Sequence, residues 1–494
     1  MQLIKKVPAF IWAALFALIW YGFTLAPTVL WGDPAKLAIF SYKLQLGLHA
    51  AAHPLHTVIG WAWGHLPFPD YALGQNVLSA VFAALTIGIM YLLIYELTLS
   101  HKAAIITSAS LALAHTFWWL AVINESYSLS FFLFSLSLLF FIRWWKGGKD
   151  PNLGVTFFSL GLALSNHYLT FLFIPLYVGF VLIKEPRILF KPLTITGVAL
   201  AFILGAGLLV SIMTVSFLTE GASVSLRVLA DKSILPFWRN PGKIVIETLK
   251  YSAYLFFQFP LIGFGTGLIG VWALKKKDFL LTTFLLILLL ADVLFSAGYM
   301  WERQPEIMVP SYIIFALFLG MGAAQLEKQK WPKYTFSFIL VSAALLPLLL
   351  YYSMPTLTSI SGIRLLNPRV LPYRNNNYYF MVPDKRGYYG ARRYGEEVMA
   401  RAAPKALIFG DFTPLTVLRF LQTVEHKRPD IILQSVDSAV GEPLSLITLK
   451  KEVSNRPVYI LDDIAYPNLY RTKELKEKYS LKHEGLLIRV LPKQ

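Results

Sequence analysis

Residues 31–56 read WGDPAKLAIFSYKLQLGLHAAAHPLH and follow the first long apolar run of the chain. A carboxylate, Asp33, stands near the start of this stretch. From Pro34 to Ala50 apolar residues recur at a helical spacing, and the segment Leu55–Leu66 repeats the pattern. Short helices with one apolar face lie on a membrane instead of crossing it. The stretch is therefore predicted to place Asp33 at a membrane surface, followed by two membrane-surface helices. The alternative is two interfacial anchors that have no chemical role.

The composition of the whole chain indicates a polytopic α-helical membrane protein. Of its 494 residues, 56% are hydrophobic and only 15% are charged, whereas a soluble domain carries about a quarter of charged residues. Apolar runs of about 20 residues recur, and each is long enough to cross a bilayer as a helix. Because the chain has no cysteine, disulfides, thiolate metal sites and cysteine nucleophiles are excluded.

The net charge of +17 is attributed to basic cytoplasmic loops and to attraction by anionic membrane lipids. Nucleic acid is not an expected partner, because no basic stretch is long enough, or interleaved enough with aromatic residues, to follow a nucleic-acid backbone.

The apolar runs predict about eleven transmembrane helices. They are expected at about 8–30, 76–98, 103–122, 127–143, 153–166, 168–183, 192–213, 247–273, 279–297, 309–326 and 334–352. The first run is too long for the apolar core of a signal peptide and is interpreted as an uncleaved span. Most loop lysines and arginines fall on one side of this arrangement, which makes that side cytoplasmic. The protein is thus predicted to be a multi-pass protein of the cytoplasmic membrane, with its N-terminus in the cytoplasm.

The composition changes after residue 352, which ends the predicted transmembrane domain, 1–352. Residues 353–390 are rich in Tyr, Asn, Arg and Pro and are predicted to form an irregular linker. From 391 to 494 strand-like runs (ALIFG, DIILQ, PVYILD) alternate with helical ones. The last helix is expected over 471–479 and the last strand around 485–491. This alternation predicts an α/β domain with a mainly parallel sheet. The domain is expected on the outer, periplasmic or extracellular side.

The polar residues that could carry chemistry are predicted on the outer side of the membrane. Besides Asp33, the loops and span ends there carry Lys36, His53, His56, Glu125, Tyr127, Asn166, His167, Glu302 and Arg303. Ionisable groups at membrane depth are costly to bury and are therefore candidates for function. Taken singly, a carboxylate at the water boundary explains Glu125 equally well, and a lone histidine such as His167 is more often a satisfied core or interfacial residue than a ligand. Agreement among five separate loops predicts a cavity that opens outward.

The position of this cavity restricts its chemistry. A nucleotide sugar is not available on the outer side, so an activated sugar has to arrive in the lipid, as a polyprenyl-linked phosphosugar. Transfer of that sugar to a hydroxyl needs a carboxylate as general base, and Asp33 is the candidate. It also needs cations or hydrogen-bond donors for the leaving phosphate. The candidates for this second role are Arg303, His167, His53 and Lys36.

Several short motifs carry a resemblance to a known family. Gly32–Asp33 and His53–Pro54 stand in the first outer loop, and residues 76–86 read NVLSAVFAALT. Further motifs are Thr116–Trp118 with Glu125, Tyr127 and Leu129; Ser165–Asn166–His167; and Val309–Pro310–Ser311–Tyr312. Together they resemble the GT-C superfamily of integral-membrane glycosyltransferases, and most of all its bacterial branch related to the metazoan transmembrane O-mannosyltransferase. The chain departs from that branch at Lys36, where the family has an acidic residue, and in the order of charges around Glu302–Arg303.

The resemblance implies a GT-C-like fold, a polyprenyl-phosphate sugar donor, an inverting transfer and a catalytic aspartate in the first outer loop, here Asp33. It also implies Glu125, Asn166 and His167 as site residues. The acceptor is expected to be a hydroxyl of a protein, glycan or lipid, and mannose or another hexose is the sugar that the related proteins suggest. No metal ligands and no cofactor are predicted, and the use of a divalent metal is left open.

Two other interpretations of the chain stay open. A lipid or sugar-lipid transporter or flippase would also have many spans and an outward cavity, although the sequence lacks the internal repeat that is typical of transporters. A non-catalytic membrane scaffold is the other alternative, because Lys36 replaces the acid of the family.

Overall fold

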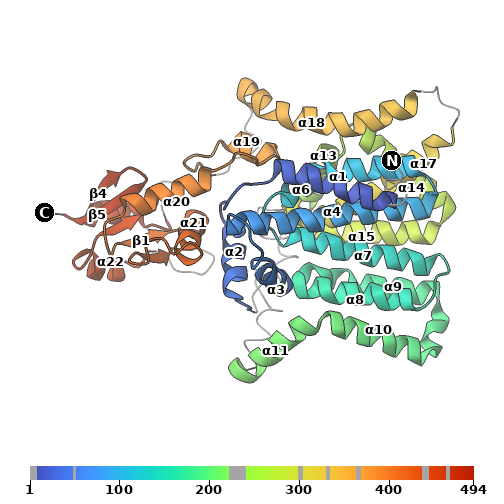
Figure 1. Ribbon diagram of the computed structural model, residues 1–494, viewed down its shortest axis with the longest axis horizontal. Coiled ribbons are helices and arrows are strands. Elements are labelled where there is room, and N and C mark those ends of the chain that lie inside the picture. The colour runs from blue at the N-terminus through green and yellow to red at the C-terminus, as the bar shows by residue number, and fades with distance from the viewer. Residues whose placement is uncertain are drawn as a thin grey trace.

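The computed structural model describes residues 8–47, 52–221, 241–298, 304–329, 334–362, 369–436, 444–462 and 468–493. A bundle of apolar helices makes up most of the molecule, and a smaller domain with a β-sheet lies at one end of it (Figure 1). The predicted site residues Glu302 and Arg303 lie outside the described residues.

The bundle contains most of the helices. In chain order they are α1 (Ala9–Thr24), α4 (Tyr71–Thr98), α5 (His101–Ala112), α6 (His115–Ala121), α7 (Tyr127–Trp145), α8 (Pro151–Asn166), η2 (Tyr168–Leu172), α9 (Ile174–Lys184), η3 (Pro186–Phe190), α10 (Pro192–Gly205), α11 (Gly207–Glu220), α13 (Pro241–Gln258), α14 (Ile262–Lys277), α15 (Phe279–Gly298), α16 (Gln304–Ile307), α17 (Val309–Glu327) and α18 (Thr335–Ser361). Among the described residues, five helices are long and apolar enough to cross a membrane, or up to eight if each bent pair counts as one span. The protein is thus a multi-pass membrane protein, and the number of eleven spans stays a prediction.

Three of the predicted spans are bent pairs of helices. The bend is 70° between α5 and α6, 67° between α10 and α11, and 113° between α13 and α14. The last bend falls at Pro260, which lacks the N–H that a continuing helix needs, and the next residue, Leu261, has a φ of 48°. The span predicted over 247–273 is therefore not one continuous helix.

Close helix packing in the bundle depends on small residues, as is usual in membranes. Where α14 meets α17, a Cβ added to Gly270 would lie 1.6 Å from the carbonyl oxygen of Phe318, and one added to Gly322 would lie 1.9 Å from that of Thr266. Only glycine allows the two backbones to approach so closely.

The loops that the sequence assigns to the cytoplasmic side meet at the end of the bundle far from the sheet (Figure 1). Arg143 pairs with Glu96 at 2.5 Å, and the Lys277 ammonium donates to the carbonyl oxygen of Leu97 at 2.7 Å. The chain thus sorts its loops to two ends. Which end faces the cytoplasm stays a prediction.

Two short helices, α2 (Asp33–Lys43) and α3 (Pro54–Trp63), lie between the bundle and the sheet-containing domain (Figure 1). The helix predicted to reach Ala50 ends at Lys43, because Leu44 adopts a left-handed φ of 49° and the Gln45 N–H returns to the Phe40 carbonyl at 2.9 Å, a common helix-ending geometry. Leu37, predicted on the lipid-facing side of this helix, is buried within the protein.

The domain at the end of the bundle has one five-stranded sheet in the order β2-β1-β3-β5-β4. Its strands are β1 (Leu407–Gly410), β2 (Ile432–Ser435), β3 (Val458–Ile460), β4 (Tyr479–Glu484) and β5 (Leu487–Pro492), and its helices are α20 (Gly390–Arg401), α21 (Phe412–Thr423), α22 (Leu446–Val453) and α23 (Thr472–Lys478). β1 pairs in parallel with β2 and β3, and β5 pairs antiparallel with β3 and β4. The edge strand β4 was not predicted, because its run YSLKHE has too few apolar residues to show a strand period.

The stretch 353–390 is not an irregular linker throughout. α18 continues to Ser361, and α19 covers Asn376–Met381. The segment that follows is fixed to the bundle: the Lys385 N–H donates to the carbonyl oxygen of Thr24 at 2.9 Å, and its buried ammonium lies 5.3 Å from the rings of Trp119 and Tyr379. Burial lowers the pKa of Lys385 to about 7.

Arg392 on α20 is a second tie between the two parts of the molecule. Its guanidinium donates to Asp70 at 2.8 Å and to the Thr28 hydroxyl at 2.6 Å, and also bonds Glu425. Asp70 in turn accepts the Leu73 N–H and so caps α4. One side chain thus links the sheet-containing domain to the chain segment that leads into Asp33.

Replacing Arg392 with methionine is expected to lower the free energy of unfolding by about 1–3 kcal/mol, because partly buried carboxylates lose their partner. Thermal unfolding of the purified protein and faster hydrogen exchange over residues 26–33 would report the change. Arg471→Met, which removes a more exposed pair with Glu474, is the matched control and is expected to change stability by less than about 0.5 kcal/mol. Equal effects of the two substitutions would contradict the role of Arg392 as a stabilising link between the sheet-containing domain and the bundle.

Candidate active site

Asp33 is the first residue of α2 and is half-buried. The preceding Gly32 has a φ of 74°, a conformation that glycine adopts without steric cost, so the chain turns sharply into the helix. Trp31 contacts α20 and the residues just before it. Its indole N–H donates to the Tyr388 hydroxyl at 2.7 Å, and its ring lies 5.1 Å from that of Tyr394. The carboxylate is therefore held between an anchored tryptophan and a helix start.

The loop between α6 and α7 holds the first turn of α2. The Asn124 side-chain amide donates to the carbonyl oxygen of Pro34 at 3.0 Å. The next residue, Glu125, is only 5% exposed, and its backbone N–H donates to the Ser79 hydroxyl at 3.2 Å. The structure thus brings Glu125 to the same end of the bundle as Asp33. Asn124 was not among the predicted site residues, although it stands directly before one of them.

Asn166, at the end of α8, joins three segments. Its side-chain oxygen accepts the His56 N–H at 3.1 Å, and its amide nitrogen donates to the Ser126 carbonyl at 2.9 Å and the Ser130 hydroxyl at 2.7 Å. Its own carbonyl oxygen lies 2.9 Å from His53 Nδ1. These bonds fix α3 and α7 against α8. Asn166 therefore positions the site, and its contact with a substrate stays a prediction.

Three of the predicted residues form a row of rings. His53 and His167 stack with ring centres 5.1 Å apart, and Tyr127 lies 5.3 Å beyond His167. His53 Nδ1 faces a carbonyl oxygen and must carry its proton there, whereas His167 Nδ1 accepts the Leu169 N–H at 3.2 Å. When both rings are neutral, His167 keeps its proton on Nε2 and is a donor there, whereas His53 Nε2 is an acceptor.

Both rings are neutral at pH 7, as is His56. Burial, reinforced by the neighbouring His167, lowers the pKa of His53 well below its usual value. Burial lowers the pKa of His167 to about 4 and that of His56 to about 4. His56 is 2% exposed, and within the described residues neither of its ring nitrogens has a hydrogen-bond partner. None of the three histidines therefore supplies positive charge to this site.

Lys36 lies one turn after Asp33 and is half-buried. Its ammonium is 5.3 Å from the ring of Phe40 on the same helix and 5.9 Å from the ring of Phe412, the first residue of α21. Phe412 was not predicted to lie near the site. The available signal was its place directly after the strand ALIFGD, since ligands in parallel sheets bind at the carboxyl ends of strands.

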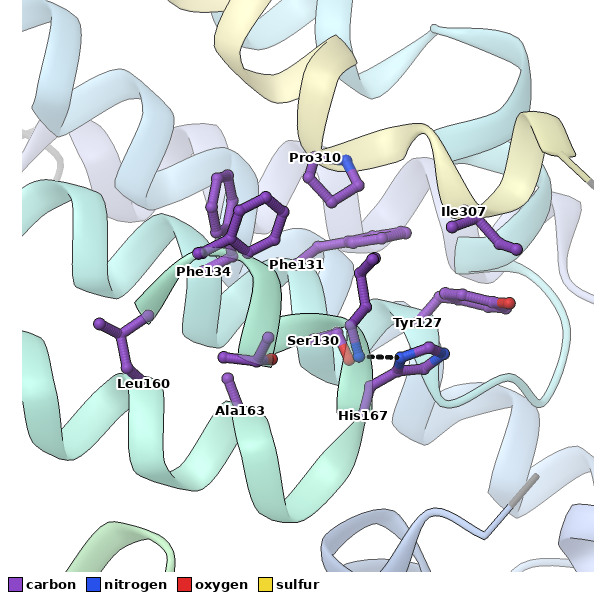
Figure 2. A pocket seen from close by; sticks show the side chains of 12 residues that line it. Tyr127, Ser130, Phe131, Phe134, Leu160, Ala163, His167, Ile307 and Pro310 are labelled. Carbon is purple, nitrogen blue, oxygen red and sulfur yellow. Dashed lines mark hydrogen bonds between the residues drawn. The ribbon is translucent and has the colours of Figure 1, made fainter. Parts of the chain in front are cut away.

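A narrow apolar recess begins beside Tyr127 and His167 (Figure 2). It has about 410 Å³ of atom-free space, part of which is open solvent. Its lining comes from α7, α8, η2, α16 and α17: Tyr127, Ser130, Phe131, Phe134, Leu160, Ala163, His167, Leu169, Thr170, Phe173, Ile307 and Pro310. Figure 2 shows the ring of Phe131 facing Pro310 across the recess. Its cavity volume is only about 20 Å³, and most of its lining is apolar.

No group of three or more histidine, aspartate or glutamate side chains in the described part of the chain is arranged to hold a metal ion. Besides Tyr127 and the amides of Asn124 and Asn166, the polar groups of the site are one half-buried carboxylate, one buried carboxylate, one lysine and three neutral histidines.

The fold matches that of ArnT from Cupriavidus metallidurans. Its apo crystal structure gives a TM-score of 0.57 at 14% identity and covers 99% of this chain and 98% of that chain. The crystal structure bound to undecaprenyl phosphate gives 0.55 at 13% identity, with 98% and 97% covered. The chain is therefore a membrane protein with the GT-C fold.

Sequence comparison narrows the likeness. Residues 33–189 match the family model described as the N-terminal domain of Protein O-mannosyl-transferase TMEM260. The Mus musculus protein of that name is 23% identical over 177 residues, which are 35% of this chain and 24% of the mouse protein. The chain thus spans about a quarter of the length of this relative. The resemblance to GT-C proteins of the O-mannosyltransferase branch, predicted from the motifs, is confirmed.

The lowered histidine pKa values predict a pH-dependent stability. A buried His56 with a pKa of about 4, against about 6.5 when unfolded, contributes fully above pH 6.5 and progressively less as the pH falls toward 4. The melting temperature of the detergent-solubilised protein is expected to fall progressively as the pH drops below 6.5. His56→Met is expected to reduce that slope by up to about 1.4 kcal/mol per pH unit.

The matched control is His483→Gln, which changes a residue of the edge strand β4 and is expected to leave the slope unchanged. An unchanged slope in His56→Met would show that this histidine is not the titrating group.

Proposed function

We propose that this protein transfers a sugar from a polyprenyl-phosphate carrier to an acceptor hydroxyl. The main support is that α2 carries Asp33 and Lys36 one turn apart, at the end of the bundle where the His167 donor and the apolar recess lie. A base, a cation, a neutral donor and an apolar surface for the isoprenoid tail are the parts that such a transfer needs.

The donor is proposed to lie with its isoprenoid tail in the recess and its phosphate near His167 (Figure 2). The undecaprenyl phosphate bound by the structurally similar ArnT supports this choice of carrier. His167 Nε2–H donates to a phosphate oxygen, and Lys36 supplies positive charge. Arg303, which lies outside the described residues, is proposed as a second cation in the same role.

Asp33 is proposed as the general base. Its carboxylate takes the proton of the acceptor hydroxyl while the hydroxyl oxygen forms a bond to the anomeric carbon. The bond from that carbon to the phosphate oxygen breaks, and its electron pair leaves with the polyprenyl phosphate. Attack from the face opposite the phosphate inverts the anomeric centre. Proton transfer of this kind contributes about 10²–10⁴-fold to the rate.

The remaining predicted residues are assigned to the sugar and the acceptor. Glu125 and the unprotonated Nε2 of His53 accept hydrogen bonds from sugar hydroxyls, and Tyr127 offers a ring face and a hydroxyl. Glu302 is proposed to contact the acceptor. Mannose as the sugar and a protein as the acceptor are proposed from the name of the mouse relative. His56, with both ring nitrogens buried, is proposed to support the site by packing and not to contact the substrate.

Purified protein supplied with polyprenyl-phosphate mannose, labelled in the sugar, tests the proposal. Wild type is expected to release or transfer the label, and Asp33→Asn is expected to do so about 10²–10⁴-fold more slowly while binding undecaprenyl phosphate normally. The matched control is Asp150→Asn, at the opposite end of the bundle and paired with Lys191, which is expected to keep full activity. A parallel assay with a chelator tests the use of a divalent metal.

Equal activity of wild type and Asp33→Asn would end the assignment of Asp33 as the base. Absence of turnover with any lipid-linked sugar would favour a scaffold, and movement of the intact donor across a vesicle membrane would favour a flippase.

The sidedness of the site is a separate prediction. A reporter enzyme fused after Gln494 that is active only outside the cytoplasm is expected to be active, because the loop lysines and arginines place the other end of the bundle in the cytoplasm. A cytoplasmic signal would put Asp33 on the side where nucleotide sugars are available and would remove the reason for a lipid-linked donor.

A further inference from the structure

The outer domain contacts the helix that carries the proposed base along its length. α21 lies beside α2 (Figure 1). At one end, the ring of Phe412 lies 5.9 Å from the Lys36 ammonium. At the other, the Tyr42 hydroxyl and His426 Nε2 are 3.3 Å apart. The two helices therefore run side by side, with the start of α21 next to the first turn of α2.

The start of α21 is unusually well fixed. Asp411, directly before Phe412, is 5% exposed and accepts the Thr413 N–H at 3.2 Å, which caps the helix. Arg369 donates to both oxygens of Asp411 at 2.6 Å and also to Asp462 at 2.7 Å, at the ends of two neighbouring parallel strands. The Tyr470 hydroxyl accepts the Asp411 N–H at 2.9 Å. Phe412 thus projects from a turn that has little freedom to move.

Lys36 needs such an anchor more than its neighbours do. A lysine side chain has about 2 kcal/mol of rotamer entropy, and the nearby histidines are neutral. Among the site residues that the structure describes, the Lys36 ammonium therefore brings the positive charge, and its position matters. Phe40 of the same helix offers one ring face at 5.3 Å, and Phe412 offers a second at 5.9 Å. Two aromatic faces, from two parts of the molecule, restrict the ammonium to the space between them.

We propose that Phe412 is a positioning residue of the transfer site: the outer domain, through the β1–α21 turn, holds Lys36 where it meets the phosphate of the lipid carrier. This inference rests on the proposed function, in which Lys36 binds that phosphate. It assigns the outer domain a direct part in the site, and it makes Arg369 the residue that keeps Phe412 in place.

A double-mutant cycle tests the inference, with the dissociation constant for undecaprenyl phosphate as the readout. Lys36→Met is expected to weaken binding by about tenfold or more, because a charge-assisted hydrogen bond is lost. Phe412→Leu is expected to weaken it about two- to fivefold. In the Lys36→Met background, Phe412→Leu is expected to have no further effect, because Phe412 acts only through the lysine.

Two further variants guard against a purely structural effect. Phe412→Tyr keeps the aromatic face and is expected to restore wild-type affinity. Phe190→Leu, which changes an exposed ring of η3, is expected to change nothing. Melting temperatures of all variants show whether each one is folded. If Phe412→Leu is not folded, Phe412→Met takes its place.

The outcomes distinguish the phosphate role of Lys36 from the positioning role of Phe412. If Lys36→Met binds the lipid phosphate as wild type does, the phosphate role of Lys36 is wrong, and the inference falls with it. If Lys36→Met weakens binding but Phe412→Leu has no effect, or has the same effect in both backgrounds, the inference is overturned while the phosphate role stands. Loss of affinity that appears only when Lys36 is present supports it.

Discussion

The bilayer imposes the constraint from which the arrangement of this protein follows. Backbone polar groups in hydrocarbon must be satisfied within the segment that carries them, so irregular backbone is confined to the ends of the bundle or to protein-lined spaces. The sharp turn at Gly32, the α6–α7 loop with Asn124 and the end of α8 at Asn166 all lie at one end. Because side chains on such backbone can converge without breaking a helix, the candidate chemistry gathers there.

Much of this arrangement can be predicted from the sequence, because it depends on local patterns of residues. Apolar runs indicate the helical bundle, and loop charges sort the two ends. The motifs around Asp33, Glu125 and His167 mark residues that the structure brings to one end of the bundle. The strands β1 and β3 lie inside the runs ALIFG and PVYILD, and β2 begins within DIILQ and ends one residue after it. Short-range periodicity carries this information, and it does not depend on the rest of the chain.

What the sequence did not reveal depends on contacts between distant segments. Arg392 meets Thr28 across 364 positions, and Trp31 meets Tyr388 across 357. No local pattern indicates such pairs, so the packing of α21 against α2 could not be predicted. The bend between α13 and α14 was missed for a related reason. The hydropathy of 247–273 is continuous through Pro260, so it does not reveal the 113° bend after which α14 packs on α17 through Gly270 and Gly322.

Burial also changes what the predicted residues can contribute. From the sequence, His53 and His167 qualified as possible cations beside a leaving phosphate, but enclosed rings with lowered pKa values are neutral and offer one acceptor and one donor. A phosphate leaving into a site of low dielectric needs a nearby positive charge. Among the site residues that the structure describes, Lys36 is the side chain that brings it. Under the proposed function, the lysine that stands where the family has an acidic residue compensates for three neutral histidines, and the 5.9 Å contact of Phe412 with it gives the sheet-containing domain a part in the site.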